Sequence, residues 1–365
     1  MIERIANSGT AAIKKYVPGK SIREAQAELG LKQMIKLASN ENALGPSPAS
    51  VRSIRRMADQ ISVYPDSQSR EVRARLAEQL KVEPAQITTG NGADGVIYNL
   101  GMAVIDEGDE VIAPRITFPI YETITRVMRG SPVCSEMRGL RIDLADIGRR
   151  IGERTKLVFL CNPNNPTGDA LPPAELRAFL RSVPEHVLVV LDEAYADFAG
   201  RGARLDSVGL FGEGMENLFI LRTFSKIHGL AGLRFGYGIG NAQLISLINT
   251  IKPPFDVSIL AEAAALAALG DRNFVRRTLK ECSAEKRYFY EQLDSLGLPY
   301  IRSHTNFILI DTGRDARQLF QTLLERGVIV RAATLYSLPT HIRVTVGRHL
   351  ENRKFFEALR AALKS

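Results

Sequence analysis

The sequence lacks long hydrophobic runs and blocks of basic residues, and it has few cysteines. No apolar stretch reaches the roughly 18 to 20 residues that a membrane-spanning helix needs, so no membrane partner is expected. The first residues do not join a basic start to an apolar stretch, so no signal peptide is predicted. The three cysteines, Cys134, Cys161 and Cys282, are scattered without C-x-x-C spacing, which argues against disulfides and a zinc site. We therefore expect a cytoplasmic protein that binds no metal.

Positive charge is in excess, but the basic residues do not gather in one segment of the sequence. The formal net charge is +8 and the pI is about 9.4. Arginines alternate with acidic residues, as in residues 69–78, which is typical of a solvated helix face. This pattern argues against nucleic acid as a partner. It favours an anionic small molecule, which a positive field attracts.

What is present is an ordinary globular composition, 45% hydrophobic and 24% charged. Short apolar runs at residues 109–113, 156–161, 187–191 and 218–221 alternate with helical patterns such as residues 173–180. The alternation predicts an α/β fold with a mainly parallel sheet. After about residue 265 a long charged helical pattern, two more apolar runs and a closing helix indicate a smaller α+β domain. Ligands of such sheets bind at the carboxyl ends of the strands, so the residues that follow each strand matter most.

One glycine-rich loop has the spacing of a dinucleotide site. Residues 90–95 read GNGADG, a literal G-x-G-x-x-G. A dinucleotide site also needs an acidic residue at the end of the second strand. Here Asp109 and Glu110 lie at its start. The context therefore favours a site for a single phosphate at a helix N-terminus, with a tight strand–helix turn as the plain structural alternative.

Polar residues follow three of the predicted strands. Asn165 lies in a rigid turn after the run at residues 156–161, and Asp192 and Tyr195 follow the run at 187–191. Ser225 and Lys226 follow the run at 218–221, with a glycine-rich segment and Arg234 shortly after. A carboxylate directly after five apolar residues is expected to be partly buried and to need a cationic partner. The arrival of these residue types at successive strand ends points to one shared site.

Such a set suits pyridoxal phosphate chemistry. Lys226 offers the amine for the aldehyde, Asp192 can hold the ring nitrogen protonated, and Tyr195 with Asn165 can donate to the phenolic oxygen. Phe118 can stack on the ring. The phosphate can be held by a group of donors that comprises Ser225, Arg234 and the backbone of Gly92, Ala93 and Asp94. We take Lys226, Asp192 and Tyr195 as the candidate catalytic residues.

The chain resembles class I/II, fold-type I aminotransferases, and within them histidinol-phosphate aminotransferases. The resemblance covers essentially the whole length. It rests on YVPGK at 16–20, SNENALGPSP at 39–48, YPD at 64–66, NNPTG at 164–168, DEAY at 192–195, SK at 225–226 and RVTVG at 343–347.

The resemblance implies a fold, a division into domains and a dimer. The expected large domain, residues 45–265, has a mainly parallel seven-stranded sheet between helices. Residues 1–44 form an N-terminal arm and part of the small domain, and residues 266–365 form the C-terminal small domain. In the implied homodimer, Tyr64 reaches the cofactor phosphate of the other subunit and Tyr16 covers the neighbouring substrate pocket.

The resemblance also implies a reaction. L-histidinol phosphate gives its amino group to the cofactor, and 2-oxoglutarate then receives it, in a ping-pong sequence with Lys226 moving the proton. Arg343 takes the substrate's anionic group, Arg331 assists it, and Asn165 also borders the substrate.

Three positions depart from the family pattern: Gly95 where an acidic residue is common, Ala43 where proline is usual and Phe118 where tyrosine is common. These departures weaken the substrate assignment more than the cofactor assignment. Two alternatives of similar architecture stay open, an aromatic amino acid aminotransferase and a threonine-phosphate decarboxylase of the same fold.

Overall fold

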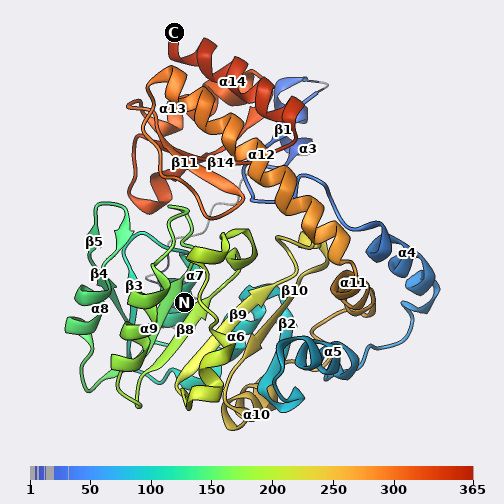
Figure 1. Cartoon of the computed structure of the whole chain (residues 1–365), viewed down its shortest axis with the longest axis vertical. Helices are drawn as coiled ribbons and strands as arrows, with labels where there is room; N and C mark the ends of the chain where they lie inside the picture. The colour runs from blue at the N-terminus through green and yellow to red at the C-terminus, as the bar shows by residue number, and fades with distance from the viewer. Residues whose placement is uncertain (1–4, 6–7, 12, 14–19, 32, 365) are drawn as a thin grey trace.

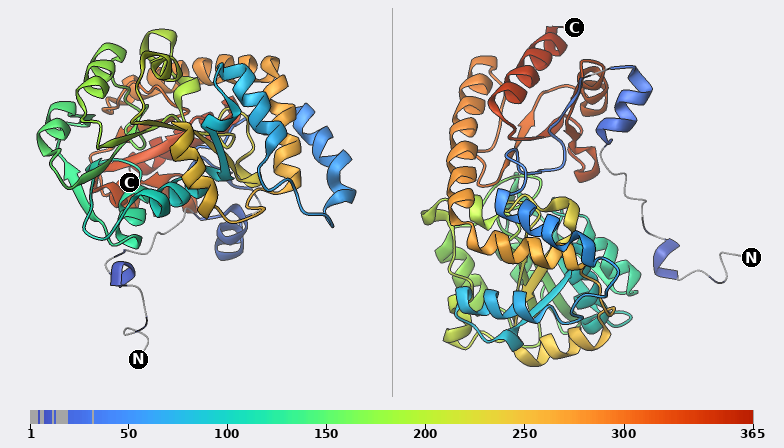
Figure 2. Two further views of the ribbon diagram at one scale, coloured as in Figure 1. Left: turned by 90° about the horizontal axis from the view of Figure 1, so that it is seen from below. Right: turned by 90° about the vertical axis from the view of Figure 1, so that its right-hand side faces the viewer.

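The structure is a computed structural model, and it describes residues 5, 8–11, 13, 20–31 and 33–364. Its elements form two units, a larger one around a seven-stranded sheet and a smaller one above it (Figure 1). The chain crosses from the small unit to the large one along residues 37–47, which we call the crossing segment. It returns through the long helix α12, Arg272–Leu296, which rises from one unit to the other (Figure 2).

The large sheet has the strand order β2-β10-β9-β8-β7-β3-β4. Its strands are β2 (Ile87–Asn91), β3 (Glu110–Pro114), β4 (Ser131–Ser135), β7 (Thr155–Cys161), β8 (Leu188–Asp192), β9 (Leu218–Thr223) and β10 (Phe235–Ile239). β10 runs antiparallel to both of its neighbours, and the pairs among β4, β3, β7, β8 and β9 are parallel. The predicted α/β fold with a mainly parallel seven-stranded sheet is confirmed.

Both faces of this sheet are buried, which explains its continuous apolar runs. In β8, Val189 and Leu191 point into one core while Val190 points into the other, as strand alternation requires. The first core is closed by helices α5 (Arg70–Leu80), α8 (Leu144–Arg150), α9 (Pro173–Ser182) and α11 (Ile259–Gly270). The second is closed by α6 (Gly92–Val104), α7 (Ile120–Val127) and α10 (Ala242–Ile251). Helix α4 (Pro48–Met57) packs on α11.

The small unit has its own core, built on a three-stranded antiparallel sheet. Its strands are β11 (Phe307–Asp311), β14 (His341–Thr345) and β13 (Arg331–Ala332), and helices α13 (Ala316–Glu325) and α14 (His349–Lys364) cover it. The short strand β1 (Ile35–Lys36) pairs in parallel with β12 (Val328–Ile329). Phe289 and Leu293 of α12 enter the same core. Shorter described elements are α2 (Ser8–Ala11), α3 (Ile22–Leu29), β5 (Met137–Arg138) and β6 (Arg141–Ile142).

The packing of α11 bears on where the two units divide. This helix continues to Gly270, and Ala268 packs in the core of the large unit. A boundary at residue 265 would therefore cut through it. We propose that the large unit ends at Gly270, before α12 begins under the Asp271 cap, whose side chain accepts from the Phe274 amide at 3.0 Å. Leu37 packs in the small core, in keeping with an N-terminal contribution to that unit.

None of the helices that the structure describes is both long and apolar enough to cross a bilayer.

Candidate active site

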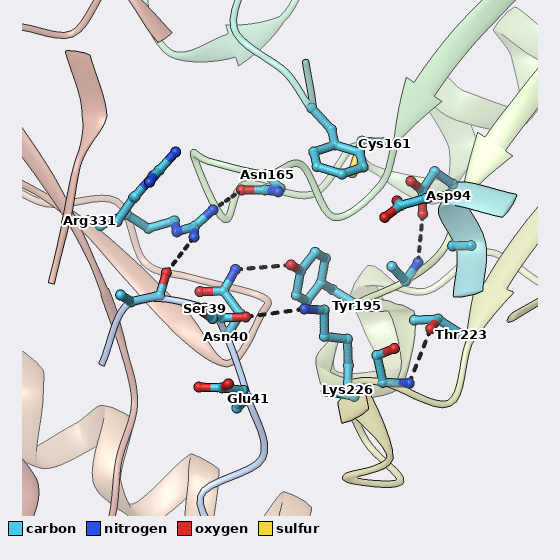
Figure 3. A pocket seen from close by; sticks show the side chains of 18 of the residues that line it. Ser39, Asn40, Glu41, Asp94, Cys161, Asn165, Tyr195, Thr223, Lys226 and Arg331 are labelled. Carbon is cyan, nitrogen blue, oxygen red and sulfur yellow. Dashed lines mark hydrogen bonds between the residues drawn. The ribbon is translucent and has the colours of Figure 1, made fainter. Parts of the chain in front are cut away.

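A pocket of about 280 Å³ lies between the two units, beside the carboxyl ends of β7, β8 and β9 (Figure 3). The crossing segment and the small unit complete its wall. Residues from both units line it: Ala38, Ser39, Asn40, Glu41, Ala93, Asp94, Phe118, Cys161, Asn165, Asp192, Ala194, Tyr195, Thr223, Ser225, Lys226, Ala231, Arg234, Arg331, Tyr336 and Arg343. The pocket therefore brings together most of the side chains that the sequence singled out.

Lys226 stands three residues beyond the end of β9, and its side chain is partly buried. Its Nζ donates to the Ser39 carbonyl at 3.3 Å. Burial, with the positive Arg343 nearby, lowers the pKa of Lys226 from 10.5 to about 8. Roughly a tenth of the amine is then neutral at pH 7, far more than for an ordinary lysine, and the neutral amine is the form that a Schiff-base nucleophile needs.

Asp192 ends β8 and is only 3% exposed. Its Oδ2 accepts from Tyr121 Oη at 2.6 Å, and its Oδ1 accepts from the Ala194 amide at 2.9 Å. Burial raises the pKa of Asp192 to about 6. The cationic partner expected for this carboxylate is missing from the ion pairs of the described residues, although Glu193 beside it pairs with Arg222 at 2.7 Å. A buried carboxylate without a cation suits a ligand that brings one, such as a protonated pyridine nitrogen.

Tyr195 and Asn165 flank the same space. Tyr195 Oη accepts from Asn40 Nδ2 at 2.9 Å, and burial raises the pKa of this phenol, so the hydroxyl keeps its proton. Asn165 Oδ1 accepts from Arg343 Nη1. The amide nitrogen of Asn165 and the hydroxyl of Tyr195 are thus the donors that a phenolic oxygen would need.

An anion cradle forms where α6 begins. The amides of Ala93 and Asp94 lie in the first turn of a 13-residue helix, whose dipole favours negative charge. Arg234 Nη1 lies 3.5 Å from Ser225 Oγ, and Nη2 lies 3.4 Å from an Asp94 carboxylate oxygen. The Gly92 amide, which was predicted as a donor, instead donates to the Arg234 carbonyl at 3.0 Å. Gly92 gives room, because a β-carbon there would lie 2.4 Å from Arg234 Nη2.

A second positive centre lies on the small unit. Arg343 of β14 is 6% exposed; its Nη2 donates to the Ala38 carbonyl at 2.8 Å and its guanidinium lies over the Phe307 ring at 5.2 Å. Among the described residues its Nε is buried without a hydrogen-bond partner. Arg331 is its direct partner in the β13–β14 pairing and lines the same pocket. The pocket therefore has two separate places for an anion, one on each unit.

Not every predicted residue meets in this pocket. Phe118 lines it, but Tyr64 is 78% exposed and stacks on Phe255, with ring centroids 4.6 Å apart, away from the pocket. Tyr16 lies outside the described residues. Sequence reasoning assigned no role to Asn40 or Tyr121. Asn40 carries no signal beyond its place in a quoted motif, whereas Tyr121 stands one helical turn after Phe118 on a face that resembles ordinary core.

Comparison with known proteins agrees with this geometry. The family described as aminotransferase class I and II matches residues 32–359. The chain is 45% identical to histidinol-phosphate aminotransferase of Moorella thermoacetica, over 96% of this chain and 91% of that protein. It is 40% identical to the protein of the same name from Caldicellulosiruptor saccharolyticus, over 96% and 98% of the two chains.

Solved structures show the same fold. Histidinol-phosphate aminotransferase of Sinorhizobium meliloti, in complex with pyridoxal-5'-phosphate, superposes with a TM-score of 0.89 at 27% identity, over 97% of this chain and 99% of that one. Aspartate aminotransferase of Thermus thermophilus with maleate gives a TM-score of 0.84 at 25% identity, over 98% and 99%.

The fold and the pocket define a pyridoxal-phosphate enzyme of the aminotransferase type. The chain belongs to the class I and II aminotransferase family. The predicted family, fold, enzyme class and cofactor are thereby confirmed.

Proposed function

We propose that this enzyme transfers the amino group of L-histidinol phosphate to 2-oxoglutarate. The observation that carries the proposal is the pair of anion-binding places in one pocket, separated by a lysine and a buried carboxylate. The first, at the start of α6, suits the cofactor phosphate, and the second, at Arg343, suits an anionic group of the substrate. The curated relatives named for this activity, at 40% to 45% identity over almost the whole chain, support the choice of donor.

The residues at the strand ends fit the cofactor. Lys226 would hold the aldehyde carbon through Nζ, and Asp192 would hold the ring nitrogen. Ser225, Arg234 and the amides of Ala93 and Asp94 would hold the phosphate. When bound, pyridoxal phosphate supplies an electron sink for the pair of electrons left at the substrate's Cα.

Lys226 is also placed to move protons. Once the incoming amine has replaced it, Nζ is free to take the proton from Cα as a general base. Its lowered pKa favours the neutral form that this step needs. Asp192, held on both oxygens by Tyr121 and Ala194, would present a negative charge to the ring nitrogen of the cofactor.

Arg343 is the proposed anchor for substrates. Its fork can hold the phosphate of the donor or a carboxylate of the acceptor, because both groups offer paired oxygens. Its hydrogen bonds to Asn165 and to the Ala38 carbonyl hold that fork at the pocket wall. Arg331, beside it in the sheet, would share the charge of a phosphate.

We also propose a cytoplasmic homodimer with shared active sites. Tyr64 and Phe255 stack on each other at the surface, and Ile61 and Val63 beside them are 67% and 64% exposed. A cluster of exposed apolar side chains of this kind is typical of a subunit interface. It would allow Tyr64 to serve the partner's cofactor phosphate, with Tyr16 covering the neighbouring substrate pocket.

A donor panel tests the proposed reaction. Histidinol phosphate, phenylalanine, tyrosine and threonine phosphate are each supplied with 2-oxoglutarate, and glutamate and carbon dioxide are measured. We expect the highest kcat/KM for histidinol phosphate and no stoichiometric carbon dioxide. A clear preference for phenylalanine, or carbon dioxide released from threonine phosphate, would contradict the proposed donor.

A lysine variant tests the assignment of the nucleophile. Lys226→Ala should lose turnover and the visible absorbance of the bound cofactor, while a surface control such as Lys354→Ala keeps both. Retention of turnover and absorbance by Lys226→Ala would exclude Lys226 as the nucleophile.

A further inference from the structure

Asn40 connects the two units through its side chain. It lies in the crossing segment, is 1% exposed and has a positive φ of 56°. Its Nδ2 donates to Tyr195 Oη at 2.9 Å in the large unit. On its other side its backbone amide donates to Thr345 Oγ1 of β14 at 2.9 Å, and its Oδ1 accepts from that hydroxyl at 3.2 Å. Figure 3 shows the amide lying between the two units, pointing at Tyr195.

The partners fix which end of the amide faces Tyr195. Thr345 Oγ1 accepts the backbone N–H of Asn40 and donates its single proton to Asn40 Oδ1. Nδ2 is then left facing Tyr195, where it can only donate. Because Tyr195 Oη accepts this bond, its own proton points away from Asn40 and towards the pocket. The direction of a catalytic hydroxyl is thus set from the other unit.

The residue type at position 40 satisfies two requirements at once. A positive φ suits glycine, and asparagine is among the few other residues that adopt it readily. Glycine would fit the backbone but has no group to donate to Tyr195. The Asn40 carbonyl accepts from Asn306 Nδ2 at 3.0 Å, which holds the backbone as well.

The residues just before Asn40 contact two other members of the site. The Ser39 carbonyl accepts from Lys226 Nζ and the Ala38 carbonyl accepts from Arg343 Nη2. Three consecutive residues therefore touch the nucleophile, the substrate anchor and the phenol. These contacts exist only when the crossing segment is seated between the units.

We infer that Asn40 is a positioning residue that turns the Tyr195 hydroxyl proton towards the phenolic oxygen of the cofactor. The inference rests on the proposed function, because the bound pyridoxal phosphate supplies that oxygen. A proton held there stabilises the oxygen as an anion. It thereby lowers the pKa of the nitrogen through which Lys226 would be joined to the cofactor, so this nitrogen is easier to deprotonate.

The visible absorbance of the bound cofactor reports this directly, because its pH titration follows that deprotonation. The charged groups that face Lys226 are Arg343, Asp94, Glu41 and Arg234, and all of them stay in place in the variants. Asn40→Gly keeps the backbone and removes the donor. Asn40→Asp keeps the shape but accepts the Tyr195 proton, which turns it away from the cofactor. We expect the titration midpoint to rise by roughly half a pH unit for Asn40→Gly, and further for Asn40→Asp.

A double-mutant cycle separates this role from a general effect on structure or charge. Both substitutions are repeated in a Tyr195→Phe background, which has no hydroxyl to orient. There Asn40→Gly should leave the midpoint unchanged, and Asn40→Asp should show only the shift caused by its added charge. Asn42→Asp is the matched control, since Asn42 Nδ2 donates to the Ile227 carbonyl at 2.8 Å and not to Tyr195. It should show no coupling to Tyr195→Phe.

The outcomes are distinct. Equal shifts in the two backgrounds, or no shift with either substitution, would overturn the role of Asn40. A parent enzyme that binds no pyridoxal phosphate, or shows no visible absorbance with it, would instead overturn the proposed function. Because two variants of different character are compared, failure of one to fold still leaves the other to decide.

Discussion

Burial shifts the pKa values of Asp192 and Lys226 in opposite directions, and in both cases it favours the uncharged form of the side chain. It raises the pKa of the acid to about 6 and lowers that of the amine to about 8, so both pKa values come closer to pH 7. Both positions were predictable from the sequence, because an ionisable residue at the end of a buried strand, or a few residues beyond it, reaches the ligand edge of the sheet. The Tyr121 and Asn40 contacts were not, because they join residues 71 and 155 positions apart.

Asp192→Asn separates function from stability at this position. We expect kcat to fall at least a hundredfold, since an amide cannot stabilise a positive ring nitrogen. In the apoprotein the raised pKa means that the free energy of unfolding falls as pH rises from 3.8 through about 6, and the cost is fully present at pH 7. The variant apoprotein should therefore melt at pH 7 no lower than the parent. A much lower melting temperature, or near-normal turnover, would mean that Asp192 is mainly structural.

At the scale of elements, the start of α6 shows how a motif can be located correctly while one of its predicted hydrogen-bond donors is wrong. The residues 90–95 were expected to cradle a phosphate through three amides, yet the Gly92 amide is bonded to the Arg234 carbonyl. Sequence spacing cannot reveal this, because the antiparallel strand β10 that brings Arg234 alongside begins more than 140 residues later. Sequence spacing also cannot show why glycine stands at position 95. A β-carbon there would lie 3.3 Å from that of Asn91, so glycine keeps the turn compact.

Gly92→Ala tests the cradle as a unit. Its φ of 74° is unfavourable for alanine, and the new β-carbon would displace the Arg234 guanidinium. We expect the dissociation constant for pyridoxal phosphate to rise about tenfold or more, since backbone strain and a lost charged hydrogen bond each cost about 1 to 2 kcal/mol. Titration of the apoprotein by absorbance measures it. Gly148→Ala, in helix α8 away from the pocket and with nothing within 4 Å of an added β-carbon, is the control and should leave the constant unchanged.

At the scale of the whole molecule, the proposed dimer predicts complementation between two defective chains. Lys226→Ala and Tyr64→Ala are mixed, unfolded and refolded together. A hybrid dimer would contain one site with both Lys226 and Tyr64 intact. Random pairing then restores about a quarter of all sites, whereas separately refolded samples mixed afterwards stay inactive. No recovery, in samples that sedimentation shows to be dimers, would contradict a shared site.

The pairing of β1 with β12 has a consequence for how the enzyme is made. Ile35 lies opposite Val328, and the Asn40 amide donates to Thr345, so the first strand that the structure describes can pair only after residues close to the C-terminus have been made. A chain growing on the ribosome can complete the large sheet early, while the residues that seat Lys226, Tyr195 and Arg343 are still unassembled. Truncated or stalled chains would thus carry a folded sheet without a finished pocket, and the capacity to react appears only after synthesis is almost over.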